Sequence, residues 1–180
     1  MKLKIIKDSN PIMRKKSLPV EMPLSKEDRA TLDAMLDYLK KSQDEEYAKK
    51  HNYRPGVGMA AIQVGLLKRM FVIYYETEKG PVQYQLVNPV MLETSVKKCA
   101  LEAGEGCLSV DTEHEGLVHR YYKIKLKAYN ALTDEDIELT AFGYDAIVLQ
   151  HEYDHLNGVF YYDHIDKLAP AQKLDNEVLI

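Results

Sequence analysis

Near its carboxyl end the sequence contains the stretch Ala146-Ile147-Val148-Leu149-Gln150-His151-Glu152-Tyr153-Asp154-His155. The first four residues are apolar enough for a buried element, and Asn157-Gly158 supplies a typical helix stop after them. We therefore expect a helix from about Tyr144 to Asn157 that crosses the core. Histidines at positions i and i+4 of a helix lie one turn apart on nearly the same face, so His151 and His155 can bind one metal ion together.

Glu152 lies about 100° around the helix axis from His151. Its carboxylate can reach the open side of such a metal site and take a proton from a water molecule there. The alternative is two ordinary surface histidines with Glu152 and Asp154 as ion-pair partners, and the histidine spacing alone would favour it. A glutamate in this position inside an apolar helix favours the metal site.

Two histidines leave a tetrahedral site one protein ligand short when the fourth position holds water. One large group of metallopeptidases places a third histidine after a glycine, but Tyr161 stands at that position here. Another group uses a glutamate on a following helix, and after residue 160 only Glu177 remains. Cys107, next to a glycine that lets backbone approach closely, is a reasonable third ligand. The other cysteine, Cys99, is expected to be a small buried apolar residue.

A third stretch that could contribute to binding or catalysis is Gly56-Val57-Gly58-Met59-Ala60-Ala61-Ile62-Gln63. It matches a dinucleotide-binding pattern, but that pattern must follow a strand, and this stretch follows a predicted helix and a turn. Its glycines expose backbone that can pair with an extended peptide, and the Gln63 amide can donate a hydrogen bond to a developing oxyanion. The alternative for Gln63 is an ordinary surface polar residue.

The remaining sequence predicts one long helix and several strands. Ser25 and Asp28 form a capping box ahead of apolar residues at helical spacing, which predicts an amphipathic helix from about Lys26 to Lys50. Alternating and β-branched patterns predict strands over residues 70–75, 82–87 and 90–96, with Asn88-Pro89 as an interruption, and an antiparallel hairpin over residues 123–128 and 137–141. We expect an α+β fold with a mostly antiparallel sheet packed around the late helix.

Length and composition predict one soluble domain over residues 1–180, because 46% of the 180 residues are apolar and 29% are charged. The net charge of -4 gives no general attraction to nucleic acid. The basic residues near the amino terminus are interpreted as a solvated edge rather than an arm for an anionic partner. Two cysteines, no secretory segment and no long apolar run predict a cytoplasmic protein that has no membrane partner.

Taken together, the three stretches resemble the peptide deformylase family. The family motifs are Gly-x-Gly-Leu-Ala-Ala-x-Gln, Glu-Gly-Cys-Leu-Ser and Gln-His-Glu-x-x-Asp-His, and they occur here in that order between residues 56 and 155. The last two match without exception. Met59 replaces the usual leucine with a side chain of similar volume, and Ile62 replaces a frequent proline or threonine. The long stretch between the first two motifs resembles that of the longer bacterial members of the family, which occur in Gram-positive organisms.

The resemblance implies one divalent metal ion held by Cys107, His151 and His155. It implies that Glu152 is general base and then general acid, and that Gln63 and the backbone N–H of Leu108 hold the oxyanion while water attacks the formyl carbon and formate leaves. Fe²⁺ is the ion implied for the cell, and Zn²⁺, Ni²⁺ or Co²⁺ are alternatives in purified protein.

The implied substrate is the formylmethionyl end of a nascent chain. It would lie extended beside Gly56, Val57 and Gly58, with its methionine side chain in an apolar pocket that includes Val148. The ribosome is a further candidate partner, and direct reading of nucleic acid is not expected. Two other hypotheses are a metallopeptidase of the His-Glu-x-x-His type and a binding module in which the ion only stabilises the fold.

Overall fold

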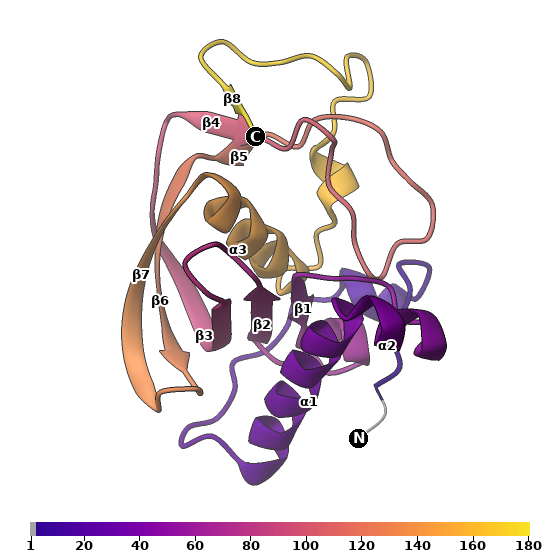
Figure 1. The fold of residues 1–180 in the computed structure, drawn as a ribbon. Coiled ribbons are helices and arrows are strands. Elements are labelled where there is room, and N and C mark those ends of the chain that lie inside the picture. The colour runs from indigo at the N-terminus through magenta and orange to yellow at the C-terminus, as the bar shows by residue number, and fades with distance from the viewer. Residues whose placement is uncertain (1–2) are drawn as a thin grey trace.

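The computed structural model describes residues 3–180, and its framework is a five-stranded sheet in which every neighbouring pair is antiparallel (Figure 1). In spatial order the strands are β1 (Gly58–Ala60), β2 (Met70–Tyr75), β3 (Val82–Thr94), β6 (Lys123–Asn130) and β7 (Glu135–Phe142). A smaller sheet contains β5 (Arg120–Tyr121), β4 (Lys98–Ala100) and β8 (Val178–Leu179), with β4 and β8 parallel. The predicted α+β class, with a mostly antiparallel sheet, is confirmed.

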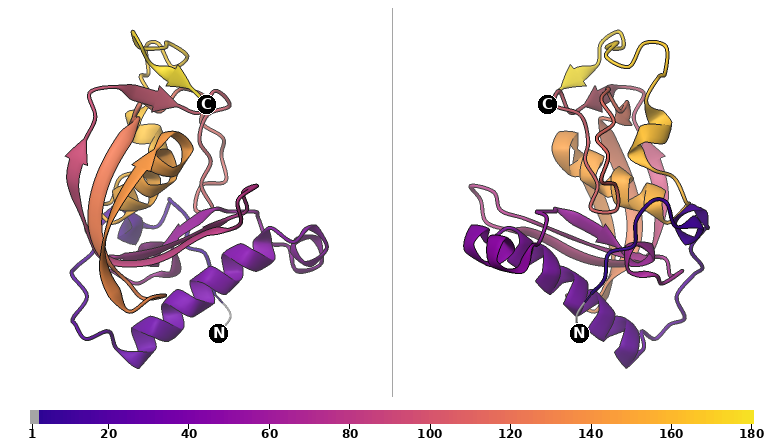
Figure 2. Two further views of the ribbon diagram at one scale, coloured as in Figure 1. Left: turned by 60° about the vertical axis from the view of Figure 1, so that its left-hand side comes forward. Right: turned by 90° about the vertical axis from the view of Figure 1, so that its right-hand side faces the viewer.

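Helix α3 (Gly143–His155) lies in the hollow of the curved sheet (Figures 1 and 2). Its bounds are within two residues of the predicted ones. The apolar residues 146–149 are all buried, because the helix contacts β1, β2, β6 and β7 as well as the smaller sheet. Gly158 follows the helix with φ of 73°, the left-handed conformation that favours glycine at a helix end.

The single helix predicted over residues 26–50 is wrong, because the chain forms two helices, α1 (Lys26–Ser42) and α2 (Glu45–His51). Ser25 caps α1 as expected by accepting a hydrogen bond from the N–H of Asp28. Asp44 starts α2 in the same way by accepting from the N–H of Tyr47. The break is therefore caused by a second capping residue inside the predicted helix.

Strands β1 and β2 are buried on both faces, since α1 and α3 cover opposite sides of them (Figure 2). Met59, Met70 and Val72 pack in one cluster with residues of α1, and their chain neighbours pack in the other cluster with residues of α3. Within residues 3–180, no helix combines the length and the apolar character that a membrane crossing requires.

Strand β3 runs through Asn88-Pro89, where an interruption was predicted. Its register against β6 shifts between Val87 and Val90, and Asn88 has a φ of 51°. The side-chain amide of Asn88 accepts from the N–H of Val20 and donates to the carbonyl of Val20. A bulge that is supported by a distant segment lets the strand continue past the proline.

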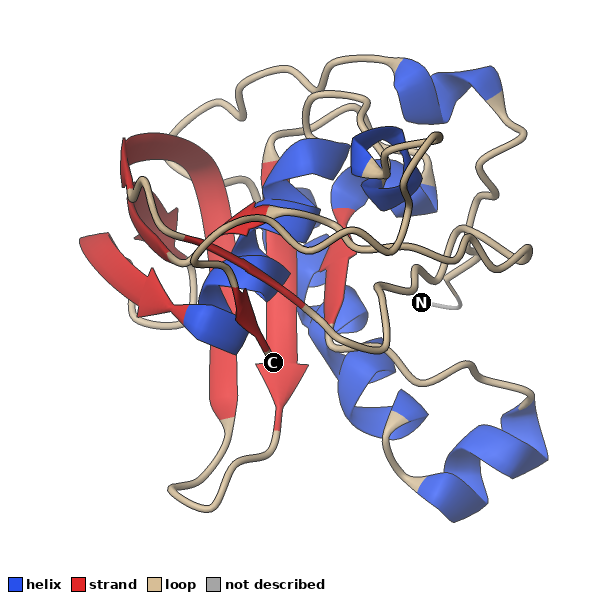
Figure 3. Cartoon of the chain, turned by 90° about the horizontal axis from the view of Figure 1, so that it is seen from above, coloured by secondary structure: helices blue, strands red, loops and turns tan. Residues whose placement is uncertain are grey.

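The chain between these elements is largely irregular, and one loop bears directly on the site. Residues 101–119, between β4 and β5, form no helix or strand and carry Cys107 (tan in Figure 3). The predicted hairpin is confirmed as β6 and β7. Short 3₁₀ helices are η1 (Pro11–Arg14), η2 (Ala61–Val64) and η3 (Tyr161–His164).

Candidate metal centre

The fold brings Cys107, His151 and His155 together. One side-chain ligand atom from each residue lies within 4.8 Å of the other two. Sγ of Cys107 is 3.3 Å from Nε2 of His155. The histidines come from consecutive turns of α3 and the cysteine from the loop over residues 101–119, so the three residues predicted as ligands meet at one point.

This donor set fits a divalent transition metal, because a thiolate and two imidazoles bind such ions well. Nδ1 of His151 is 2.8 Å from Oε2 of Glu105, which orients the ring and leaves Nε2 for a metal. Burial by itself would lower the pKa of His151, but the adjacent Cys107 thiol and Glu105 carboxylate raise it well above the ordinary value. The surroundings therefore favour a positive charge at this point.

Burial sets the protonation of His155 and of the neighbouring Glu152. It lowers the pKa of His155 well below the ordinary value, so this ring is neutral and can offer a lone pair. It raises the pKa of Glu152 to about 7, although the neighbouring His151 opposes the shift. Among residues 3–180 nothing hydrogen-bonds Oε2 of the buried Glu152. A carboxyl group in this state can both accept and return a proton near neutral pH.

An ion-pair network centred on the buried Arg120 supports Glu105, the partner of His151. Arg120 donates from Nε to Oε1 of Glu105 at 2.8 Å and from Nη2 to Oε2 at 3.0 Å, and its Nη1 pairs with Asp154. Burial by itself would raise the pKa of Glu105, but hydrogen bonds from Arg120 and His151 lower it to about 2. Neither Glu105 nor Arg120 was predicted to have a role at the site, because no local pattern in the sequence signals that β5 brings an arginine here.

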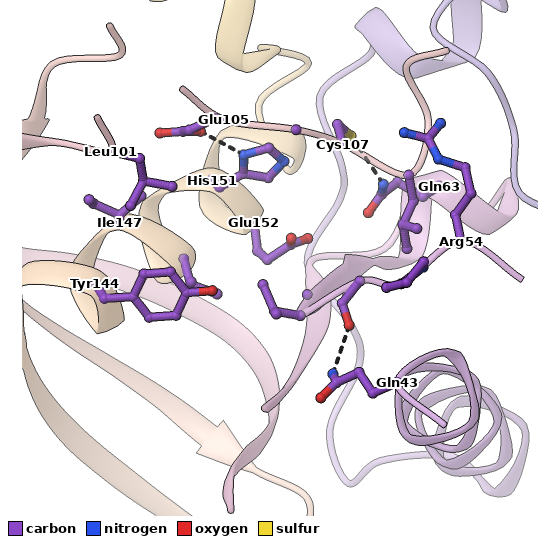
Figure 4. A pocket seen from close by; sticks show the side chains of 17 residues that line it. Gln43, Arg54, Gln63, Leu101, Glu105, Cys107, Tyr144, Ile147, His151 and Glu152 are labelled. Carbon is purple, nitrogen blue, oxygen red and sulfur yellow. Dashed lines mark hydrogen bonds and ion pairs between the residues drawn. The ribbon is translucent and has the colours of Figure 1, made fainter. Parts of the chain in front are cut away.

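Gln63 is 1% exposed, so the interpretation as a surface residue is wrong. Its Oε1 accepts from the N–H of Ala60 at 2.8 Å. Its Nε2 lies 3.1 Å from Oγ of Ser109 and 3.5 Å from Sγ of Cys107, which directs the amide hydrogens toward the ligand cluster (Figure 4). The backbone N–H of Leu108 has no acceptor within the described part of the chain.

A cavity of about 410 Å³ opens beside the cluster (Figure 4). It is lined by every predicted site residue except His155: Gly56, Val57, Gly58, Gln63, Cys107, Leu108, Val148, His151 and Glu152. The other lining residues were not predicted as site residues: Gln43, Arg54, Pro55, Leu101, Glu105, Gly106, Tyr144 and Ile147. Tyr144 and Ile147 could have been found, since they precede His151 at helical spacing, whereas Gln43 and Leu101 have no local signal.

Neighbouring side chains fill the space that a side chain would need at Gly56 and at Gly58. A Cβ on Gly56 would come within 2.8 Å of Cδ1 of Leu108, and a Cβ on Gly58 would come within 2.7 Å of Cδ of Glu152. Gly58 begins strand β1, which within residues 3–180 pairs with β2 alone and forms one edge of the large sheet. Its outer edge can accept an extended peptide as an added strand.

The two residues considered as third ligands of a metallopeptidase have other positions. Tyr161 stacks beside His151, with ring centroids 6.1 Å apart. Oε1 of Glu177 is 2.7 Å from Nδ1 of His119. The sulfur of Cys107 lies beside the two imidazoles instead, which favours the peptide deformylase resemblance over the metallopeptidase.

Comparisons with known proteins agree with this geometry. Residues 2–171 match the sequence profile of the family described as polypeptide deformylase. The peptide deformylase of Macrococcus caseolyticus is 51% identical over 170 residues, which cover 93% of this chain and 92% of that protein. Peptide deformylase 2 of Bacillus subtilis is 43% identical over 177 residues, covering 98% and 96%.

Solved structures give the same result. The peptide deformylase of Thermotoga maritima matches with a TM-score of 0.71 at 33% identity, covering 92% of this chain and 99% of that one. A class I type b peptide deformylase of Acinetobacter baumannii, bound to Met-Ala-Ser, matches with a TM-score of 0.72 at 30% identity and the same coverage. By motif, fold and sequence identity, the chain therefore belongs to the polypeptide deformylase family of metal-dependent hydrolases.

Proposed function

We propose that Cys107, His151 and His155 hold one Fe²⁺ ion and that Glu152 transfers the protons of the reaction. The reaction is that of the family: hydrolysis of the N-formyl group from the formylmethionine of nascent polypeptides, with release of formate. The observation that carries the assignment of roles is the cluster of one sulfur and two imidazoles, with the buried carboxylate of Glu152 beside it.

Fe²⁺ is proposed from the motif resemblance, and it accepts the mixed sulfur and nitrogen donors present here. Zn²⁺, Ni²⁺ and Co²⁺ can bind the same donors in purified protein. When bound, the ion supplies Lewis-acid activation of water and of the formyl oxygen.

The peptide would lie extended along the outer edge of β1, beside Gly56, Val57 and Gly58. The methionine side chain would fill the apolar part of the cavity next to Val148. The structure from Acinetobacter baumannii that is bound to Met-Ala-Ser supports a peptide substrate, because Met-Ala-Ser is what remains when formyl-Met-Ala-Ser loses its formyl group.

Glu152 would accept a proton from the attacking water and then give it to the methionine nitrogen as the C–N bond breaks. A pKa of about 7 suits both transfers near neutral pH. The amide of Gln63 and the N–H of Leu108 would donate hydrogen bonds to the carbonyl oxygen as it becomes negative.

The location and partners of the enzyme are also part of the proposal. Both cysteines are free thiols, which suits a reducing compartment, and we place the reaction in the cytoplasm, on chains that emerge from the ribosome. Residues 1–180 would act as one catalytic domain.

The central test is formate release from formyl-Met-Ala-Ser by protein purified without oxygen, with the metal content measured on the same sample. We expect about one ion per chain and one formate per peptide consumed. Metal-loaded protein that releases no formate would overturn the proposed function.

Two variants separate the alternatives. Cys107→Ala should lose both metal and activity, whereas a metallopeptidase that did not use the sulfur would keep its metal. Glu152→Gln should keep the metal and lose at least ~10²-fold in rate. A module in which the ion only stabilises the fold predicts that Glu152→Gln changes nothing.

A further inference from the structure

The carboxyl end of α1 binds both backbone hydrogen-bonding groups of Gly56. Nε2 of Gln43 donates to the carbonyl oxygen of Gly56 at 2.8 Å and to that of Tyr74 at 2.7 Å (Figure 4). Oγ of Ser42 accepts from the N–H of Gly56 at 3.2 Å. The hydroxyl of Ser42 donates to the carbonyl of Leu39 at 2.8 Å, so its oxygen is oriented to accept. Two neighbouring residues at one helix end therefore fix the two peptide units that meet at Gly56 in the cavity wall.

The opposite side of the same wall contacts the catalytic groups. Leu108 packs against Gly56 and Glu152 packs against Gly58, each closer than a side chain on the glycine would permit. The segment over residues 56–58 is thus held between the end of α1 and the residues proposed to act on the formyl group. A shift of this segment would change the edge that it offers to a peptide.

Gln43 also extends the pairing of a very short strand. Regular pairing of β1 with β2 begins at Gly58 opposite Ile73, and the N–H of Tyr74 donates to the carbonyl of Val57 at 2.9 Å. Beyond that point, the single Nε2 of Gln43 bridges the carbonyls of Gly56 and Tyr74. An edge strand of three residues has few ladder bonds of its own, so this bridge supplies order that the strand lacks.

We propose that Gln43 and Ser42 are positioning residues that hold Gly56, Val57 and Gly58 as a preformed edge for the peptide part of the substrate. The inference rests on the proposed function and adds two residues to it. A preformed edge lowers the cost of ordering on binding, so its value grows with the number of substrate residues that pair with it. Formylmethionine alone has no backbone beyond its first residue and would benefit little.

The test compares formyl-Met-Ala-Ser with formylmethionine on metal-loaded protein. Gln43→Met keeps the length of the side chain and removes the donor, and Ser42→Ala removes a single acceptor. Lys41→Met is the matched control, because Lys41 lies at the same helix end, has 42% of its side chain exposed and forms its ion pair with Asp37. Thermal unfolding of each variant shows whether it is folded.

For Gln43→Met we expect KM for formyl-Met-Ala-Ser to rise roughly tenfold with kcat unchanged, the effect of losing two hydrogen bonds to carbonyls. Its kcat/KM for formylmethionine should stay as in the unmodified protein. Ser42→Ala should shift KM in the same direction by a smaller factor, and it carries the test if Gln43→Met does not fold. Lys41→Met should match the unmodified protein on both substrates.

A loss by the same factor on both substrates, or no change in either variant, would overturn the proposal, because a purely structural role has no dependence on peptide length. Binding of Met-Ala-Ser and of free methionine, measured by calorimetry on the same samples, gives a second readout that needs no turnover. If the unmodified protein releases no formate, the proposed function fails, and this binding comparison still decides whether Gln43 positions a peptide edge.

Discussion

The side chain of Glu152 lies directly against the backbone of Gly58, so close that a Cβ on residue 58 would come within 2.7 Å of Cδ of the glutamate. Helix α3 and strand β1 therefore meet at the point where the proposed proton carrier borders the proposed peptide edge. Any side chain at residue 58 must displace one of the two.

Gly58→Ala should displace the carboxylate of Glu152 and lower the rate of formate release by roughly 10²-fold, the usual effect of misplacing a catalytic group by about 1 Å. The metal content should not change, since none of Cys107, His151 and His155 is touched. Gly80→Ala, in the turn between β2 and β3, is the control and should keep full activity. An active Gly58→Ala enzyme would show that the contact can relax.

Arg120→Met should leave the buried carboxylate of Glu105 with His151 as its remaining partner, and should leave the partly exposed Asp154 with His164. We expect the free energy of unfolding to fall by roughly 3–5 kcal/mol, measured by urea denaturation. Metal affinity, measured by competition with a chelator, should fall ~10–100-fold because His151 loses its oriented partner.

The control for this network is Arg29→Met, which removes an ion pair with Asp134 whose two side chains are 38% and 64% exposed. Its effect on stability should be much smaller than that of Arg120→Met, because solvent screens an exposed ion pair. Equal effects of the two arginine variants would contradict a special role for the buried network.

Gly158→Ala should destabilise the protein by about 2–4 kcal/mol. The residue has φ of 73°, and a Cβ there would lie 2.6 Å from the backbone carbon of Arg14. Gly80→Ala also places alanine at positive φ, but no atom lies within 4 Å of its Cβ, so it should cost only about 1–2 kcal/mol. Urea denaturation of both variants tests the difference, and equal losses would mean that the contact with Arg14 yields easily.

Cys99 should resist alkylation in the folded protein. It is fully buried, and burial raises its thiol pKa to about 11. Because the thiolate is the reacting form, only ~10⁻³ of the thiol is reactive at pH 8. Iodoacetamide followed by peptide mapping should find Cys99 unmodified at pH 8 and modified after unfolding in urea. Modification of native protein at the rate of the unfolded chain would contradict this prediction.

The raised pKa of the Cys99 thiol also makes the free energy of unfolding depend on pH. The folded state keeps the Cys99 proton to a higher pH than the unfolded chain does, so the contribution to stability is fully present below the ordinary thiol pKa of 9. It is lost as the pH rises from there toward 11. The free energy of unfolding of the unmodified protein should therefore fall in this window by more than that of Cys99→Ala.

The elements that could be predicted are those whose signals are local. Helix α3 follows from a continuous apolar stretch with a glycine stop, and β6 with β7 follows from strict alternation on both sides of an acidic turn. Local signals also explain two errors. Asp44 starts a second helix where periodicity predicted one continuous helix. Asn88 anchors a bulge that lets β3 continue past a proline.

By itself the sequence identified the atoms that we propose for the chemistry: the sulfur of Cys107, the imidazoles of His151 and His155, and the carboxylate of Glu152. Spacing along one helix and short motifs contain that information, because it depends on residue type and on neighbours in the chain. Only the tertiary structure decided what holds those atoms, namely Arg120 arriving from β5 and Gln43 from the end of α1. Such partners are set by the packing of separate elements. A contact between residues far apart in the chain produces no periodic pattern in the sequence around either residue.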